Sequence, residues 1–174
     1  MRKPQEVLQI MQIFNEREPN PRCELNFCNA YTLLVAVVLS AQSTDKGVNK
    51  ATESLFKIAD TPQKMLALGL DGLKSYIKTI GLYNNKAQSI MSLSRDLVDK
   101  FGGEVPSYRE SLESLAGVGR KTANVVLNVW FDQPTLAVDT HVFRVAHRLD
   151  FSDGKTPLAV EQDLCAILPP EYIK

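Results

Sequence analysis

Cysteine is scarce and scattered in this sequence. The 174 residues include three cysteines, Cys23, Cys28 and Cys165. Their odd number and wide spacing argue against a disulfide framework and are typical of reduced thiols in a cytosolic protein. Because no close pair of cysteines or histidines occurs, we expect the chain to encode no metal site and no cofactor of its own.

Long apolar runs and an excess of charge of one sign are also absent. The longest apolar stretch, 30–39, is too short to span a bilayer, and the amphipathic N-terminus lacks the apolar run and cleavage site of a signal peptide. We therefore expect a cytoplasmic protein with no membrane partner. The 20 basic and 20 acidic residues balance, so net charge does not indicate a nucleic-acid ligand, although a local cationic face would suffice for one.

Helical periodicity is what the sequence does contain. Hydrophobic residues make up 44% of the chain, enough for a core, and they recur at helical spacing with no convincing alternating strand pair. The segment 30–39 is apolar nearly all round, which predicts a helix buried at the centre of a helical domain. Thr61 and Pro62 predict the start of a short helix that Gly69 stops, and Gly102 closes a longer one. We expect an all-α fold.

The most informative stretch is SLESLAGVGRKTANVVLNVW, which predicts two helices joined by a tight turn. Ser107 and Glu110 have capping-box spacing for the first helix. Gly117 and Gly119 permit backbone angles closed to other residues and let the turn approach another surface closely, with Arg120 beside them. The N–H groups of the turn and of the second helix would then suit a phosphate oxygen. A plain helical hairpin, with glycines for geometry only, explains the same residues.

Two residues in this region could do chemistry. Lys121 lies in the first turn of the second helix, where the macrodipole and partial burial would favour the neutral, nucleophilic amine; the alternative is a solvated surface lysine. Asp139 suits the N-cap of the next helix, although Val142 stands where a capping box would have Glu or Gln. An N-cap aspartate can also act chemically, so both roles remain open. His141 and His147 are expected to be surface or cap-region groups rather than ligands.

Four segments together resemble the endonuclease III family of helix-hairpin-helix DNA glycosylases. They are LLVAVVLSAQSTD (33–45), IKTIGLYNNKAQSI (77–90), LAGVGRKTANVVLN (115–128) and AVDTHVFRVAHRL (137–149). The similarity covers nearly the whole chain. It implies a two-lobed fold in which residues 22–135 form a helical domain with the hairpin motif at about 108–131. Residues 1–21 and 136–174 would form a second, incomplete lobe, with Lys121 and Asp139 presented at the cleft.

The resemblance also implies a bifunctional DNA glycosylase and AP lyase that removes oxidised pyrimidines from damaged duplex DNA. Such an enzyme would act as a monomer, associated with the nucleoid. Lys121 would attack the sugar C1′ and form a Schiff base, Asp139 would stabilise positive charge on the sugar, and β-elimination would cleave the strand. Gln42 would fill the gap left by the flipped base, and Leu82 would insert from the opposite strand's side. The remaining implied DNA contacts are Leu115, Gly117, Val118, Gly119, Arg120, Thr140 and His141.

Two departures from the family pattern stand out. Family hairpins usually read Leu-Pro-Gly, whereas this one has Ala116. The family also ends in a four-cysteine loop that holds a [4Fe–4S] cluster, and Cys165 does not match that pattern. We expect a cluster only if the natural protein continues past Lys174. The rival interpretations are a truncated or non-catalytic helix-hairpin-helix DNA-binding protein and a hydrolytic glycosylase without lyase activity, which Lys121 disfavours.

Overall fold

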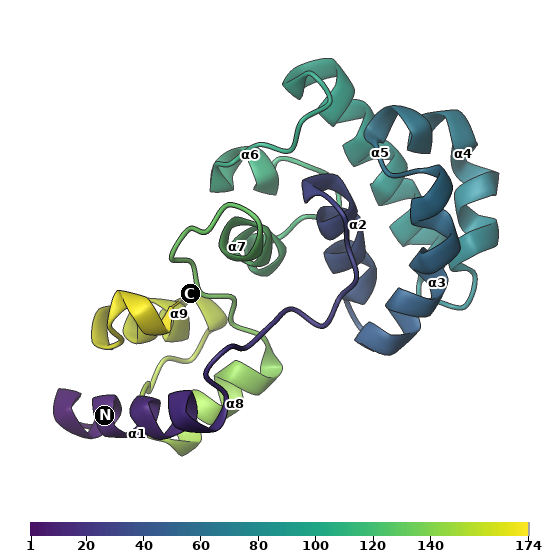
Figure 1. Cartoon of the computed structure of the whole chain (residues 1–174). Helices are drawn as coiled ribbons and strands as arrows, with labels where there is room; N and C mark the ends of the chain where they lie inside the picture. The colour runs from purple at the N-terminus through teal and green to yellow at the C-terminus, as the bar shows by residue number, and fades with distance from the viewer. Residues whose placement is uncertain (174) are drawn as a thin grey trace. The chain divides into compact units, whose positions relative to one another are not determined.

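The computed structural model describes residues 1–173, and every regular element among them is a helix (Figure 1). The expectation of an all-α fold is therefore confirmed. The elements are α1 Pro4–Arg17, α2 Ala30–Ser40, α3 Asp45–Ile58, α4 Pro62–Ile77, α5 Tyr83–Phe101, α6 Arg109–Glu113, α7 Arg120–Val129, α8 Thr140–Arg148, α9 Pro157–Ile167 and the 3-10 helix η1 Pro170–Tyr172. None of the helices in this described part is long and apolar enough to cross a membrane.

The chain divides into two units, each with its own apolar core. The central unit is Cys23–Phe131 and contains α2 to α7. The terminal unit combines Met1–Arg22 with the chain from Asp132 onward, and it contains α1, α8, α9 and η1. Lys121 therefore belongs to the central unit and Asp139 to the terminal unit.

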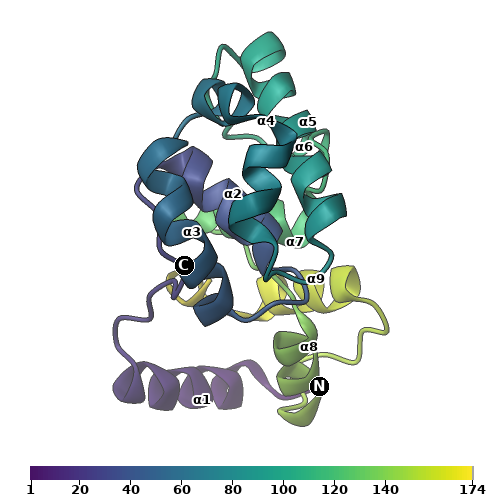
Figure 2. The same ribbon diagram turned by 90° about the vertical axis from the view of Figure 1, so that its right-hand side faces the viewer.

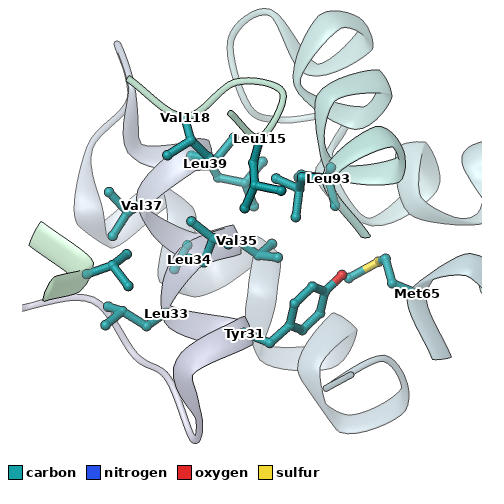
Figure 3. Close-up of a cluster of buried hydrophobic side chains, with 14 of the residues drawn as sticks. Tyr31, Leu33, Leu34, Val35, Val37, Leu39, Met65, Leu93, Leu115 and Val118 are labelled. Atoms are coloured by element: carbon teal, nitrogen blue, oxygen red, sulfur yellow. The ribbon is translucent and has the colours of Figure 1, made fainter. Parts of the chain in front are cut away.

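Helix α2 is the centre of the central unit. Residues 33–39 are at most 4% exposed, and α3, α5 and α7 all contact this helix. Figure 3 shows its side chains surrounded by those of other helices. Asn29 caps the helix, because its Oδ1 accepts a hydrogen bond from Thr32 N at 2.8 Å while Thr32 Oγ1 accepts one from Asn29 N at 3.0 Å. The predicted buried central helix is confirmed.

The helix ends predicted at Gly69 and Gly102 are also present in the central unit. Thr61 Oγ1 accepts a hydrogen bond from Lys64 N at 3.2 Å, and Pro62 opens α4. Gly69 has a φ of +78°, which breaks α4 into two helical segments, and Gly102 ends α5 with a φ of +62°. Helices α4 and α5 then pack side by side, as Figures 1 and 2 both show.

The N-cap of α6 is not Ser107, the residue that the predicted capping box with Glu110 would place there. The N-cap of α6 is Tyr108, whose extended backbone has a φ of −122° and whose side chain makes no capping hydrogen bond. The first helical hydrogen bond runs from Leu112 N to Tyr108 O at 3.0 Å, so the helix starts one residue later than the box requires. Glu110 consequently occupies the second helical position, where its charge still suits the helix dipole.

The terminal unit packs around Val7 of α1, Ala146 of α8 and Val160 of α9, each at most 3% exposed. Arg2 Nε donates to Leu149 O at 2.7 Å, which ties the start of the chain to the end of α8. A pocket of about 350 Å³ lies beside this core, and its described lining is almost entirely apolar side chains. Such a lining offers a polar ligand few hydrogen-bonding partners.

Candidate functional site

The turn between α6 and α7 is anchored in the core of the central unit. Leu112, Leu115 and Val118 are at most 6% exposed, and Val118 N donates to Leu115 O at 3.2 Å within the turn. Figure 3 shows Leu115 and Val118 directed into the apolar cluster close to Leu39 of α2. These two side chains hold the turn in place, so any contact of the turn at this point with another molecule must use the backbone.

A side-chain bond also joins the two helices of the hairpin. Arg109 Nε, at the start of α6, donates to Asn124 Oδ1 in α7 at 3.0 Å. Asn124 is fully buried. A charge-assisted bond between a guanidinium and a buried amide restricts the relative movement of the helices. This bond therefore links the two helices of the hairpin.

The two glycines of the turn differ in their geometry. Gly117 has a φ of +75°, and a Cβ atom added there would lie 2.8 Å from Ser89 Cβ, so only glycine fits. Gly119 has an ordinary φ of −96°, so the prediction that it needs glycine's backbone freedom is wrong. No atom lies within 4 Å of the position that a Gly119 Cβ would occupy. The absent side chain leaves open surface at the start of α7.

That helix start has the chemistry of an anion site. Gly119 is the N-cap of α7 and, having no side chain, makes no capping bond. The amide N–H groups of the first turn, which include those of Lys121 and Thr122, point along the positive end of the helix dipole. Arg120 beside them is half-buried. The arrangement suits a phosphate oxygen.

Lys121 is exposed in the first turn of α7 rather than partly buried. None of the ion pairs among residues 1–173 includes it. The positive end of the helix dipole lies at this position, so the helix does not stabilise the charge of Lys121. The geometry of the helix thus leaves Lys121 available to a reacting group.

Asp139 is the N-cap of α8, so the capping role is confirmed. Its Oδ1 accepts hydrogen bonds from His141 N at 2.9 Å and Val142 N at 2.8 Å. Both bonds use the same oxygen, so Oδ2 of the half-buried side chain takes no part in the cap. The cap therefore fixes the orientation of the carboxylate without using its second oxygen.

The residues after Asp139 lie at the surface of the terminal unit. Thr140 and His141 are exposed, and His141 Nδ1 lies 3.2 Å from an Arg144 guanidinium nitrogen. His147 is half-buried, with its Nδ1 2.8 Å from Phe143 O. These positions agree with the expectation that the histidines are surface or cap-region groups.

Gln42 and Leu82 share a backbone feature that no sequence pattern revealed. Each has a φ of +57°, a left-handed conformation that is unfavourable for residues with long side chains. Both are exposed, Leu82 by 59%. A Cβ atom added at Gly81 would lie 3.8 Å from Gln42 O, so the two turns are neighbours within the central unit. Strained backbone of this kind is concentrated at functional sites.

The three cysteines do not fit a four-thiolate cluster. Cys23 and Cys28 belong to the central unit and Cys165 to the terminal unit. Among residues 1–173, no group of three or more Cys, His, Asp and Glu side chains could hold a metal ion. Burial raises the pKa of the Cys23 thiol, which disfavours the thiolate that a metal requires.

Comparison with known proteins identifies the class to which this fold and hairpin belong. Residues 35–170 match the HhH-GPD superfamily of base excision DNA repair proteins. Endonuclease III of Haemophilus influenzae is 58% identical over 165 residues, covering 95% of this chain and 78% of that protein. Endonuclease III of Escherichia coli strain K12 is 53% identical over the same shares of the two chains. The class is that of the helix-hairpin-helix DNA glycosylases.

A similar solved structure points to one family within this class. It is a trapped endonuclease III–DNA covalent intermediate in an estranged-adenine complex, and it matches with a TM-score of 0.94 and 46% identity over 98% of this chain and 81% of that one. The chain belongs to the endonuclease III family of helix-hairpin-helix DNA glycosylase/AP lyases. The family resemblance in the sequence is therefore confirmed, and so is the assignment as a base-excision repair enzyme with glycosylase and lyase activity.

Proposed function

We propose that this chain removes oxidised pyrimidines from damaged duplex DNA and then cleaves the strand through a Schiff base at Lys121. The observation that carries the proposal is a lysine in the first turn of an uncapped helix, in a member of the endonuclease III family. An amine nucleophile supports strand cleavage, whereas a carboxylate and water alone would only release the base. The trapped covalent intermediate of a relative supports a covalent step in this chain as well.

The reaction balances with groups that the chain, the DNA and water supply. The neutral Lys121 Nζ attacks the sugar C1′ while the bond from C1′ to the base breaks, and the base leaves with the electron pair and takes up a proton. Nζ then loses a proton. The sugar ring opens as the bond from C1′ to the ring oxygen breaks, the ring oxygen takes up a proton, and the imine forms between C1′ and Nζ. The imine acidifies the C2′ proton, whose removal expels the 3′ phosphate by β-elimination. Water then hydrolyses the imine and releases Lys121.

Asp139 supports the first of these steps. A carboxylate close to C1′ stabilises the positive charge that develops on the sugar as the base departs, and it can accept the proton that Nζ loses. The two bonds at Oδ1 hold the carboxylate in one orientation, so Oδ2 is the oxygen that faces the reaction. Pre-oriented groups of this kind act without reorganising during the reaction.

DNA binding uses the start of α7 and the surface of α8. The first-turn N–H groups of α7 bind a phosphate oxygen, with Gly119 allowing close approach and Arg120 adding charge. Leu115 and Val118 take part through their backbone, because their side chains are buried. The exposed Thr140 and His141 side chains add polar contacts, as the resemblance to the family implies.

Gln42 and Leu82 enter the base stack. A damaged base can react only after it rotates out of the duplex, which costs a few kcal/mol of stacking and pairing. Side chains that occupy the vacated space offset this cost. Gln42 fills the gap left by the base, and the apolar, exposed Leu82 enters from the side of the opposite strand.

Borohydride trapping tests the proposal. Wild-type protein mixed with a thymine-glycol duplex and sodium borohydride should yield a covalent protein–DNA adduct. Lys121→Gln should yield none while retaining binding to the duplex, and Lys100→Gln, which changes an exposed lysine of α5, should behave as wild type. An adduct that persists in Lys121→Gln overturns the assignment of the nucleophile.

The alternative of a non-catalytic DNA-binding protein is not favoured by identities above 50% to endonuclease III proteins. The proposed enzyme acts as a cytoplasmic monomer on damaged double-stranded DNA. A [4Fe–4S] cluster belongs to it only if the natural protein continues past Lys174. Visible absorption and iron content of the natural protein would test that point.

A further inference from the structure

Lys86 is a buried lysine that the proposed reaction does not use. It is the fourth residue of α5 and is 7% exposed. Its ammonium donates to Leu39 O at 2.9 Å, to Ala41 O at 2.5 Å and to Ser43 Oγ at 3.2 Å. Three acceptors match the three N–H groups of an ammonium, so the buried charge is fully hydrogen-bonded.

These bonds surround the turn that carries Gln42. Ala41 and Ser43 are its neighbours in sequence, and the carbonyls at the end of α2 lie where the helix dipole attracts a cation. On the other side, the backbone N–H of Lys86 donates to Leu82 O at 3.0 Å. One residue is therefore bonded to both of the turns whose central φ is +57°.

We propose that Lys86 is a positioning residue that holds the Gln42 and Leu82 turns in a fixed relation, so that both side chains enter the DNA base stack together. The inference rests on the function proposed for Gln42 and Leu82. Because left-handed backbone is unfavourable at both residues, each turn needs bonds that keep it in this conformation. The side chain and the backbone N–H of Lys86 supply bonds to one turn each.

A purely structural role would not require a charge at this position. Burying an ammonium has a large desolvation cost, and an apolar side chain of similar length would fill the same space without it. Burial accordingly lowers the pKa of Lys86. An apolar residue could not donate hydrogen bonds to the three oxygens near Gln42. The positioning role depends on these bonds.

The test compares two substrates that differ in the need for base rotation. A thymine-glycol duplex requires insertion of Gln42 and Leu82, whereas a single-stranded oligonucleotide with an abasic site requires only the chemistry of Lys121. Lys86→Met keeps an unbranched side chain only one atom shorter and removes all three N–H donors of the ammonium. Lys100→Met is the matched control, because Lys100 is an exposed lysine near the other end of the same helix.

Single-turnover rates on both substrates give the first result. We expect Lys86→Met to lower the single-turnover rate on the duplex by about tenfold to a hundredfold, since misplacement of a group by about 1 Å has effects of that size. The rate on the single strand should fall by less than about threefold. Lys100→Met should change neither rate. Equal losses on both substrates, or no loss on either, overturn the positioning role.

If Lys86→Met folds poorly, the Ser43→Ala variant and a hydrogen-exchange measurement can still test the proposal. Ser43→Ala removes one of the three acceptors and should lower the duplex rate selectively at an unchanged melting temperature. Hydrogen exchange should be faster at residues 40–43 in Lys86→Met than in Lys100→Met. Unchanged exchange there overturns the inference by itself, whereas failure of wild-type protein to form a borohydride adduct overturns the proposed function instead.

Discussion

A Cβ atom at Gly117 would lie 2.8 Å from Ser89 Cβ, because α5 packs directly against the hairpin turn. Gly119, two residues further on, has open space at the same place on its backbone. The first glycine is thus required by the packing of the central unit and by its φ of +75°. The second leaves room for another molecule at the start of α7.

Alanine substitutions should separate these two roles. Gly117→Ala should lower the free energy of unfolding by about 2–4 kcal/mol, because left-handed backbone and overpacking each destabilise. Gly119→Ala should change it by less than about 1 kcal/mol but weaken binding to duplex DNA. Urea denaturation and binding at one fixed salt concentration measure both effects. Equal stability of the two variants would contradict the assignment.

Two substitutions at Asp139 should separate capping from chemistry. Asn is also a good N-cap, so Asp139→Asn should melt within a few degrees of wild type yet lose base excision. Asp139→Ala should lose excision and also about 1 kcal/mol of stability, because the cap is removed. Thermal melting and single-turnover excision are the measurements. If Asp139→Asn excises at the wild-type rate, capping is the only role of this residue.

Leu82 should show a conflict between stability and activity. Asn tolerates left-handed backbone better than Leu does, so Leu82→Asn should be as stable as wild type or more stable by about 1 kcal/mol. The same change removes the apolar side chain that we propose enters the base stack, and it should slow excision from a duplex. Leu82→Met, which keeps an apolar side chain, is the control and should remain active. A fully active Leu82→Asn would exclude the insertion role.

Cys23 should react slowly and at high pH. Burial raises its pKa above the ordinary value of 9.0, and the Asp45 carboxylate acts in the same direction. Iodoacetamide should therefore modify the exposed Cys28 first, and the rate at Cys23 should still rise above pH 9.0. Mass spectrometry of a time course over several pH values would show the order, and faster labelling of Cys23 would contradict it.

The raised pKa of the Cys23 thiol also makes the free energy of unfolding depend on pH. A raised thiol pKa means that the folded state holds the proton more tightly than the unfolded state does. Its contribution to stability is therefore complete below the unfolded pKa and is lost as pH rises from about 9.0 through the raised value. Cys23→Ser should reduce this part of the alkaline decline in unfolding free energy.

Much of the helical pattern could be predicted because it depends on local chemistry. The buried α2 follows from an apolar run, and the break at Gly69 follows from the backbone freedom of glycine. The N-cap role of Asp139 follows from the geometry of its own side chain. The start of α6 was missed, because the residue that begins a helix is selected among several near-equal positions.

The sequence by itself determined the all-α class, the family and the position of Lys121 in the first turn of a helix after a glycine turn. The helical class and the position of Lys121 depend on residues close together in the chain, and the family depends on the order of motifs along it. Only the tertiary structure decided the left-handed backbone of Gln42 and Leu82 and the contacts of Lys86. In sequence, Lys86 is one more lysine on a helix, and the role that we propose for it depends on the packing of α5 against the end of α2, which brings its ammonium to oxygens 43–47 residues away.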